Sequence, residues 1–282
     1  MKPGSVLVTG AKGFLGREVV LQLKAAGWLV YSAARSGRNN EFDLLLDLND
    51  LGFSSHLDNL PRLDAIVHLA AIIDFSATDL NPIFQTNIVA TATLAEFARR
   101  HGIRLLFASS ALVAGAKTSI ISRESPVKPD TCYARSKCIA EELIWSSGVS
   151  GAVLRIGGIF GLNGPIHLGL NSAIRFVISG RPPEVMGGGT SRRNYIYVKD
   201  VSAAIVDALQ RDVSGTHLVA GSESLSIKEM LSSLCEVFLP GVDPIYREGS
   251  TGFDQLIAPS PDLPRARPFR IALEDMRAEV GR

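Results

Sequence analysis

The sequence predicts an α/β protein with a doubly wound parallel sheet, helices on both faces of that sheet, and a smaller α/β lobe in the carboxyl-terminal part. Along the first half of the 282 residues, short apolar runs alternate with longer segments of helical period, and this alternation requires crossovers and parallel strands. The runs 6–8 and 65–67 are apolar throughout, as in strands buried on both faces. A glycine-rich turn follows the first run directly.

The expected elements follow from these runs and from the apolar periodicity between them. In the first half we expect strands at 5–9, 28–33, 42–46, 64–69, 104–109 and 152–156, and helices at 14–26, 81–101 and 130–147. After Gly161, glycine and proline interrupt the pattern. There we expect helices at 170–179, 201–210 and 226–238, a strand at 195–198 and a last helix near 273–280. Ser226 and Glu229 have the spacing of a capping box.

Composition argues against several classes of protein. Hydrophobic residues make up 46% of the chain and charged residues 20%, which supports a buried core. The net charge of +1 gives no basic footprint for nucleic acid or an anionic membrane. No apolar run reaches the roughly 18 residues of a membrane span, and the first residues have no signal-peptide pattern. The three cysteines lack metal-type spacing, so we expect a cytoplasmic protein without a metal site.

The glycine-rich turn has the features of a dinucleotide-binding loop. Gly10 permits a tight turn, Gly13 permits close approach of the backbone to a pyrophosphate, and Gly16 permits close packing of helix on strand. The N–H groups at the start of the following helix would face the anion. The spacing is G-x-x-G-x-x-G, and the alternative is a purely structural turn.

The end of the second strand indicates which dinucleotide is bound. A ribose-binding carboxylate is expected there, but the sequence is Ala33-Ala34-Arg35-Ser36, with Arg38 nearby. Arg35 can clamp a 2′-phosphate, which favours NADPH, unless both arginines are solvated loop residues. Asp47 is placed to contact adenine or, alternatively, to cap a helix starting at Asn49.

Tyr133 and Lys137 lie four residues apart in a predicted helix and therefore on one face of it. An ammonium beside the phenol stabilises the phenolate and makes the tyrosine a usable proton carrier. Ser109 and Ser110 end a strand at the edge where ligands bind, and a hydroxyl there can hold a substrate carbonyl, although Ser110 can also act as a turn cap. His68 is predicted to be a hydrogen-bonded core histidine rather than a base.

These motifs resemble the extended short-chain dehydrogenase/reductase family, in its NAD-dependent epimerase/dehydratase group. The matching segments are Thr9-Gly10-x-x-Gly13-Phe14-x-Gly16, Asp47-Leu48, His68-Leu69-Ala70-Ala71, Asn87, Phe107–Gly115, Tyr133-x-x-x-Lys137, Leu154–Gly161 and Arg193–Val201. The resemblance implies a Rossmann NAD(P)-binding domain at 1–160, to which 193–220 returns, and an interwoven substrate-binding lobe at 161–282. It also implies a homodimer formed through the helices 81–101 and 130–147.

The resemblance also implies roles for individual residues. The implied catalytic triad is Ser110, Tyr133 and Lys137, with Ser110 preferred over Ser109 because it directly precedes the Ala-x-Val segment. The implied cofactor-binding residues are Gly10, Lys12, Gly13, Phe14, Leu15, Gly16, Arg35, Asp47, Leu48, Leu69, Ala70, Ala71, Asn87, Tyr133, Lys137, Ile156 and Ile159. The implied substrate-binding residues are Ser110, Ala111, Tyr133 and Arg193. For Arg193 the alternative is a structural ion pair with an acid such as Asp200.

The departures from the family pattern bear on the reaction. Sugar 4,6-dehydratases carry an Asp-Glu pair after the catalytic Ser or Thr, where this chain has Ala111-Leu112-Val113. Epimerases prefer an acid after the second strand and often have Asn at the position of Gly158. We therefore expect an NADPH-dependent reductase acting on a nucleotide-linked 4-keto-6-deoxyhexose. The alternatives are a nucleotide-sugar epimerase with tightly bound NAD, a reductase of a non-sugar ketone, and a non-catalytic nucleotide-sensing protein.

Overall fold

A seven-stranded sheet organises the first part of the protein. The structure, a computed structural model, describes residues 3–37, 43–50, 52–75, 78–250 and 252–281. The sheet has the strand order β12-β7-β5-β4-β1-β2-β3, and the neighbouring strands from β7 to β3 pair in parallel. Its strands are β1 (Ser5–Thr9), β2 (Leu29–Ala34), β3 (Leu44–Leu45), β4 (Ala65–His68), β5 (Arg104–Ser110), β7 (Gly151–Ile156) and β12 (Gly215–Val219). The predicted doubly wound fold is confirmed, and its strand order reverses between β1 and β4.

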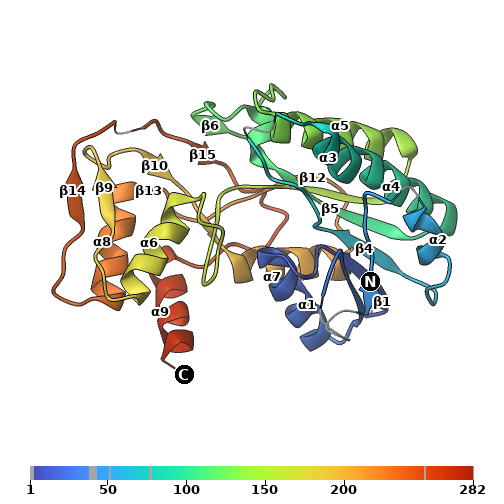
Figure 1. The fold of residues 1–282 in the computed structure, drawn as a ribbon, viewed down its shortest axis with the longest axis horizontal. Coiled ribbons are helices and arrows are strands. Elements are labelled where there is room, and N and C mark those ends of the chain that lie inside the picture. The colour runs from blue at the N-terminus through green and yellow to red at the C-terminus, as the bar shows by residue number, and fades with distance from the viewer. Residues whose placement is uncertain (1–2, 38–42, 51, 76–77, 251, 282) are drawn as a thin grey trace. The chain divides into compact units, whose positions relative to one another are not determined.

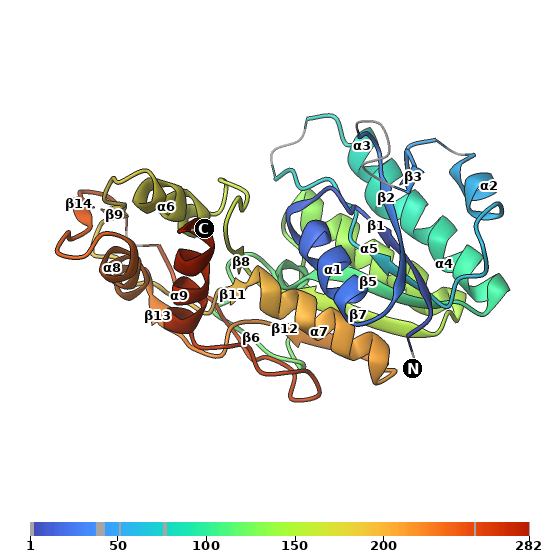
Figure 2. The same ribbon diagram turned by 90° about the horizontal axis from the view of Figure 1, so that it is seen from below.

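Helices cover both faces of this sheet. Figure 1 shows α4 and α5 on one face and α1 with α7 on the other, and Figure 2 shows the same layers from below. The helices of this part are α1 (Phe14–Ala25), α2 (Phe53–Leu57), α3 (Asn81–Ile83), α4 (Ala90–His101), α5 (Cys132–Ser147) and α7 (Val198–Gln210), with a 3₁₀ turn at Ala111–Ala114. The face under α4 and α5 buries a continuous apolar cluster.

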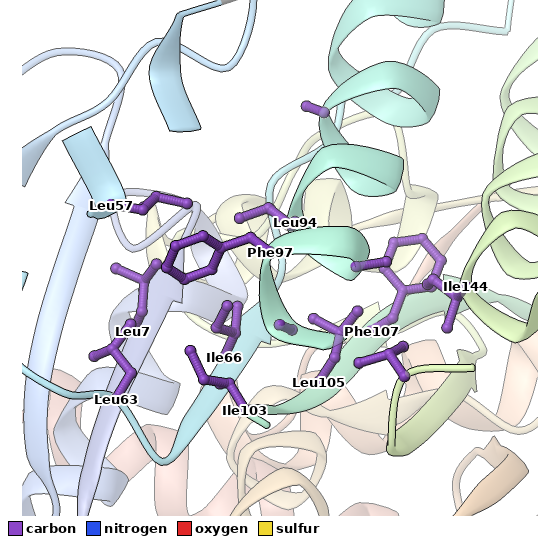
Figure 3. Close-up of a cluster of buried hydrophobic side chains, with 14 of the residues drawn as sticks. Leu7, Leu57, Leu63, Ile66, Leu94, Phe97, Ile103, Leu105, Phe107 and Ile144 are labelled. Atoms are coloured by element: carbon purple, nitrogen blue, oxygen red, sulfur yellow. The ribbon is translucent and has the colours of Figure 1, made fainter. Parts of the chain in front are cut away.

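That cluster joins the sheet to two helices. Figure 3 shows Leu7 and Ile66 from the sheet beside Leu94 and Phe97 of α4. Phe107 of β5 lies in the same cluster, and its side chain is 1% exposed. Burial of this kind stabilises the fold by about 25 cal/mol for each Å² of apolar surface removed from water. The cluster therefore fixes the relative positions of β1, β4, β5 and α4, whose ends carry the candidate site.

The helix predicted at 81–101 is interrupted by a π-helical segment. The chain is helical throughout, but Phe84–Val89 is π-helical between α3 and α4. A π turn inserts one extra residue and re-aims the side chains around it, often at functional sites. Apolar periodicity does not reveal such an insertion. Asn87 lies in this segment.

Two compact units divide the chain. The first comprises 1–116, 126–156 and 202–217, and the second comprises 117–125, 157–201 and 218–282. The second contains α6 (Gly169–Ile178), α8 (Ile227–Phe238) and α9 (Phe269–Val280), and α8 contacts both α6 and α9. Its short strands are β6 (Ile120–Ile121), β8 (Ile159–Phe160), β9 (Glu184–Met186), β10 (Arg192–Arg193), β11 (Ile196–Tyr197), β13 (Leu225–Ser226), β14 (Ile245–Arg247) and β15 (Leu256–Ile257). They form two-stranded pairs that the sequence pattern did not predict, except for β11.

Local capping explains the helix boundaries in the second unit. Ser226 and Glu229 form the expected capping box at α8. The last helix begins at Phe269, a turn earlier than expected, because the Glu223 carboxylate accepts a hydrogen bond from the Phe269 N–H at 2.7 Å. None of the helices within the described ranges combines the length and apolar character needed to cross a membrane.

Candidate active site

The glycine turn lies at the carboxyl end of β1, beside the end of β4. Gly10 has a φ of +70°, and a Cβ added to it would lie 2.7 Å from the Ala70 nitrogen. A Cβ on Gly16 would lie 2.1 Å from the Gly10 carbonyl oxygen. Side chains at these two positions would push the turn away from β4 and from α1. Glycine is therefore required there for both close approaches, as predicted.

The start of α1 can receive a phosphate. Gly13 is the N-cap of α1, and no side-chain hydrogen bond caps the helix there. Gly13 is exposed, and Phe14 and Leu15 are half-buried. This first turn lies at the point where the strand order reverses, which is where such folds bind dinucleotides. The turn and the uncapped start of the helix are the features expected of a pyrophosphate site.

Two cations lie at the end of β2. Arg35 is exposed, and the Lys12 ammonium donates a hydrogen bond to the Ser36 carbonyl at 3.3 Å. Asp47 is exposed, and its carboxylate accepts a hydrogen bond from the Asn49 N–H at 3.0 Å. Asp47 thus caps a turn. The next helix starts at Phe53, so the alternative that Asp47 caps a helix starting at Asn49 is wrong. The predicted neighbour Arg38 and the first residue of the strand predicted at 42–46 lie outside the described residues.

Tyr133, Lys137 and Ser110 come together at the carboxyl end of β5. The Ser110 side chain lies close enough to the Tyr133 hydroxyl to lower its pKa. The Lys137 ammonium donates to the Ala108 carbonyl at 2.7 Å and lies 5.9 Å from the centre of the Tyr133 ring. Ser110 also accepts from the Leu112 N–H at 3.2 Å, so it caps the 3₁₀ turn as well. Ser110 therefore caps this turn and also lies beside the Tyr133 hydroxyl.

Burial controls the protonation of this trio. Removal from water raises the pKa of Tyr133 to about 12, and the hydrogen bond with Ser110 opposes this rise. Removal from water lowers the pKa of Lys137 to about 7, and the charge of Glu141 opposes this fall. The phenol therefore needs the neighbouring cation before it can lose its proton near neutral pH. Tyr133 and Lys137 are thus both buried, and each has its pKa moved away from the value of an exposed side chain.

His68 belongs to a buried hydrogen-bonded chain. Its Nε2 lies 2.9 Å from the Thr91 hydroxyl, and its Nδ1 lies 2.6 Å from the Thr9 hydroxyl. Because Thr91 donates its proton to the Asn87 carbonyl at 2.8 Å, it must accept from His68 Nε2, which leaves Nδ1 to accept from Thr9. Burial, aided by the charge of Lys137, lowers the pKa of His68 to about 3. The prediction of a hydrogen-bonded core histidine is confirmed.

Asn87 connects the β4 loop to α5. Its amide nitrogen donates to the Ile72 carbonyl and to the Ser136 hydroxyl, each at 2.9 Å. Its amide oxygen accepts from the Ile72 N–H at 2.8 Å. Ser136 directly precedes Lys137. The π-helical segment thus aims Asn87 both at the loop that follows Ala71 and at α5.

The other predicted positions divide between the two units. Leu48, Leu69, Ala70 and Ala71 are half-buried, and Ala111 and Ile156 are buried, all in the first unit. Ile159 and Arg193 belong to the second unit. Arg193 donates to the carbonyls of Arg192, at 2.9 Å, and of Phe253. Asp200 instead pairs with Arg267 at 2.7 Å, so the proposed ion pair between Arg193 and Asp200 is wrong.

Three groups near the trio were missed by the sequence analysis. Glu141 accepts a hydrogen bond from Ser109 and forms an ion pair with Arg155 at 2.7 Å. The Phe75 ring meets the Tyr133 ring edge-on, with 5.8 Å between the ring centres. A four-residue spacing after Lys137 was the available signal for Glu141, since it places the carboxylate on the same face of the helix. Phe75 follows an irregular loop and had no such signal.

Comparison with known proteins agrees with this geometry. Residues 6–221 match the model of the NAD dependent epimerase/dehydratase family. UDP-glucose 4-epimerase 4 of Oryza sativa subsp. japonica is 30% identical over 250 residues, which cover 73% of this chain and 68% of that protein. The dTDP-glucose 4,6-dehydratase of Mycobacterium tuberculosis is 27% identical over 241 residues, covering 77% of this chain and 72% of that protein.

Solved structures show the same fold. MoeE5 in complex with UDP-glucuronic acid and NAD superposes with a TM-score of 0.82 at 26% identity, covering 99% of both chains. The UDP-glucuronic acid 4-epimerase of Bacillus cereus in complex with NAD gives a TM-score of 0.82 at 21% identity, covering 98% of this chain and 96% of that one. The fold and the glycine turn define a dinucleotide-binding protein of the Rossmann type. The chain belongs to the NAD-dependent epimerase/dehydratase family, within the extended short-chain dehydrogenases/reductases.

Proposed function

We propose that the protein is a nucleotide-sugar epimerase that holds NAD through each turnover. The observation that carries the proposal is the convergence of Tyr133, Ser110 and the buried Lys137 at the carboxyl end of β5. This constellation moves one proton on and off one oxygen atom, which is what reversible oxidation of a sugar hydroxyl requires. The similarity to UDP-glucose 4-epimerase 4 supports an epimerase over the NADPH-dependent reductase expected from the sequence alone.

Each residue of the trio has a distinct task in this reaction. Tyr133 accepts the proton of the reacting sugar hydroxyl and later returns it to the carbonyl oxygen. Ser110 donates a hydrogen bond to that oxygen and holds it within reach of Tyr133. Lys137 stabilises the phenolate and binds the cofactor ribose. A nicotinamide dinucleotide held at the glycine turn would take up the hydride and return it, so that turnover would involve no net oxidation.

The residues after Ser110 argue against loss of water from the sugar. Elimination needs a second acid and base close to the reacting carbons. Here the 3₁₀ turn Ala111–Ala114 follows directly, with the sequence Ala-Leu-Val-Ala, and Ala111 and Val113 are buried. The chain therefore lacks the Asp-Glu pair that sugar 4,6-dehydratases carry there. We assign it to the epimerase side of the family.

The second unit offers a place for the nucleotide. It contains a cavity of ≈ 380 Å³ lined by apolar side chains that include Leu170, Phe176 and Met230. Ser191 and Tyr195 line the same cavity, and Arg193 lies between them in the sequence. Apolar walls suit a flat base, and an arginine suits a diphosphate. We therefore propose the second unit as the substrate-binding lobe, with Arg193 on the diphosphate.

Turnover under controlled redox conditions tests the proposed function. The purified protein is incubated with NAD and with UDP-glucose or UDP-glucuronic acid, and the sugar is followed by NMR. We expect the C4 epimer to form while the absorbance of reduced nicotinamide stays flat. Product formation that consumes NADPH in equal amounts would refute the epimerase.

An NADPH-dependent reductase is the second candidate, and the end of β2 favours it. Arg35 is exposed, the Lys12 ammonium lies against the Ser36 carbonyl, and no carboxylate occupies 33–36. If these cations bind a 2′-phosphate, calorimetry will show NADPH binding at least about tenfold tighter than NADH, or about 1.4 kcal/mol. In that case Arg35→Ala will remove the preference. Equal or tighter binding of NADH supports the epimerase.

We also propose that the chain forms a homodimer through the helices predicted at 81–101 and 130–147. Both carry exposed apolar side chains, with Phe84 50%, Ile139 41% and Trp145 40% exposed. Exposed apolar side chains that gather into a patch mark surfaces for protein–protein contact, and we propose that these do so. Light scattering should show a dimer, and Ile139→Glu combined with Trp145→Glu should give a folded monomer. A monomeric wild-type chain would refute this assembly.

A further inference from the structure

Three successive turns of α5 each present a polar group to β5. Tyr133, Lys137 and Glu141 follow one another at intervals of four residues and therefore share one face of the helix. Their partners on β5 are, in order, the Ser110 side chain, the Ala108 carbonyl and the Ser109 hydroxyl. The first two contacts belong to the trio already described. The third contact, between Glu141 and Ser109, lies one helical turn beyond Lys137. The Glu141 side chain is buried there.

Glu141 joins three elements at this point. The carboxylate is buried, with the residue 5% exposed, and accepts the Ser109 hydroxyl of β5. Arg155 of β7 donates to the same carboxylate, from Nε at 3.1 Å to both oxygens and from Nη2 at 2.7 Å. Ser109 and Arg155 are direct partners in the parallel pairing of β5 with β7. One side chain of α5 is thereby tied to two neighbouring strands.

Stability alone does not account for a charge pair here. Replacing a buried ion pair by apolar side chains of similar volume is often neutral or stabilising, because both charges lose their hydration. The neighbouring residues Ala140 and Ile144 on α5 are already part of the apolar cluster. An apolar side chain such as leucine at position 141 would extend that cluster. Unlike an apolar contact, the carboxylate makes directional hydrogen bonds. These bonds fix the rotation of α5 about its axis and its position along the length of β5.

We propose that Glu141 is a positioning residue, which sets α5 against β5 so that Tyr133 and Lys137 meet Ser110. This inference rests on the proposed function only in taking Tyr133 as the proton carrier. Glu141 touches neither substrate nor cofactor, and it acts through Lys137 on the next turn of the same helix. Its second effect is electrostatic, since it is a fixed negative charge one turn from the Lys137 ammonium.

The charged and titratable groups around Lys137 determine how its pKa will change when the Glu141 carboxylate is removed. Glu141 and Tyr133 face Lys137 from α5, and His68 faces it from β4, where burial keeps the imidazole neutral. Arg155 of β7 faces Glu141 rather than Lys137. Glu141 is therefore the anion that opposes the effect of burial on the Lys137 pKa. Its removal lowers that pKa further, so the ammonium loses its proton at a lower pH.

The test compares Glu141→Gln with Asp212→Asn. Asp212 forms an ion pair with Arg104 at 2.7 Å, at the opposite end of β5, so this control removes a carboxylate–arginine pair from the same strand. In protein without cofactor, the titration of Lys137 is followed by NMR of carbon-labelled lysine and assigned with Lys137→Met. Turnover is measured in parallel on the same preparations.

We expect Glu141→Gln to lower the Lys137 pKa by on the order of one unit, the size expected for loss of a nearby opposite charge. We expect kcat to fall at least about tenfold with KM nearly unchanged, because geometry at the reacting atom is lost rather than binding. Glu141→Asp should recover part of both, and Asp212→Asn should change neither. The proposal would be overturned if Glu141→Gln kept the Lys137 pKa and the kcat of the wild type. It would also be overturned if Asp212→Asn changed both quantities as much as Glu141→Gln does.

Folding of the variant is addressed by a second change. If Glu141→Gln does not fold, Glu141→Gln with Arg155→Met removes both charges and leaves no unpaired cation. A folded double variant with normal kcat overturns the proposal, and one with reduced kcat supports it. If neither folds, the carboxylate is structural and the proposal fails. A wild-type protein that epimerises no nucleotide sugar defeats the proposed function instead, while the Lys137 titration still tests Glu141.

Discussion

Replacement of Tyr133 by phenylalanine removes one oxygen atom from the proposed proton path and little else. The ring keeps its buried site and its edge-on contact with Phe75. Ser110 keeps the hydrogen bond from the Leu112 N–H, so no buried hydroxyl is left without a partner. The variant should therefore fold like the wild type.

The expected magnitudes separate chemistry from stability. Loss of one hydrogen bond costs about 1 kcal/mol of unfolding free energy. Loss of a general acid–base group slows a reaction by about 100- to 10,000-fold, which corresponds to roughly 2.7 to 5.5 kcal/mol in the activation barrier. Affinity for the dinucleotide should stay within about twofold of the wild type, because the glycine turn and Lys137 are unchanged.

Turnover, cofactor affinity and urea unfolding are measured on the same preparation. Tyr197→Phe is the matched control, since it removes a hydroxyl that is hydrogen-bonded to Glu279 at 3.3 Å in the second unit. It should lose a similar amount of stability and keep its turnover. If Tyr133→Phe keeps more than about a tenth of the wild-type kcat, Tyr133 is not the proton carrier.

Three further predictions follow from the geometry around the trio. Asn87→Leu should lower the unfolding free energy in urea by about 3 kcal/mol, since it removes the two hydrogen bonds with the half-buried Ile72 and the buried one with Ser136, at about 1 kcal/mol each. Gly16→Ala should weaken dinucleotide binding in calorimetry by at least about tenfold, because its Cβ would lie 2.1 Å from the Gly10 carbonyl oxygen and displace the turn. The His68 pKa of about 3 lies below the value of 6.5 for a free side chain, so the unfolded chain binds a proton that the folded chain refuses. The stability that His68 contributes is complete above pH 6.5 and falls by about 1.4 kcal/mol per unit as the pH drops toward 3.

Each of these predictions has its own control. For Asn87→Leu, a change below about 1 kcal/mol would contradict the bridging role. Gly281→Ala, whose Cβ would lie 3.6 Å from its nearest neighbour, should bind the dinucleotide normally. For His68, NMR of the ring should show no titration between about pH 5 and 8. A midpoint inside that window would mean that the Thr9–His68–Thr91 chain does not hold the neutral ring.

The parts of the site that could be predicted are those with a local signature. The glycine spacing at 10, 13 and 16 and the four-residue spacing of Tyr133 and Lys137 are periodic features, and the structure places each group where that periodicity implies. The parallel sheet follows from the alternation of strands and helices, because parallel strands need crossovers. The order of its strands, and the edge strand β12, were not predicted.

The parts that could not be predicted depend on contacts between distant segments. Glu141 is recognisable only when β5 and β7 supply Ser109 and Arg155 to its carboxylate. The π-helical segment that aims Asn87 leaves no mark in the apolar pattern. The short strand pairs of the second unit join segments such as β9 and β14, which are separated by nearly sixty residues. Neither propensity nor spacing carries that information.

The identity of the reaction depends on what happens to the electrons, which makes the redox balance of turnover the most direct test. The purified protein is supplied with a nucleotide sugar, UDP-glucose or UDP-glucuronic acid, together with NAD, and the sugars and the reduced cofactor are measured together. The proposed epimerase predicts that two epimers approach equilibrium while reduced cofactor does not accumulate in solution. Consumption of one NADPH for each product molecule, or no epimer with either sugar while a ketone substrate is reduced, would contradict it.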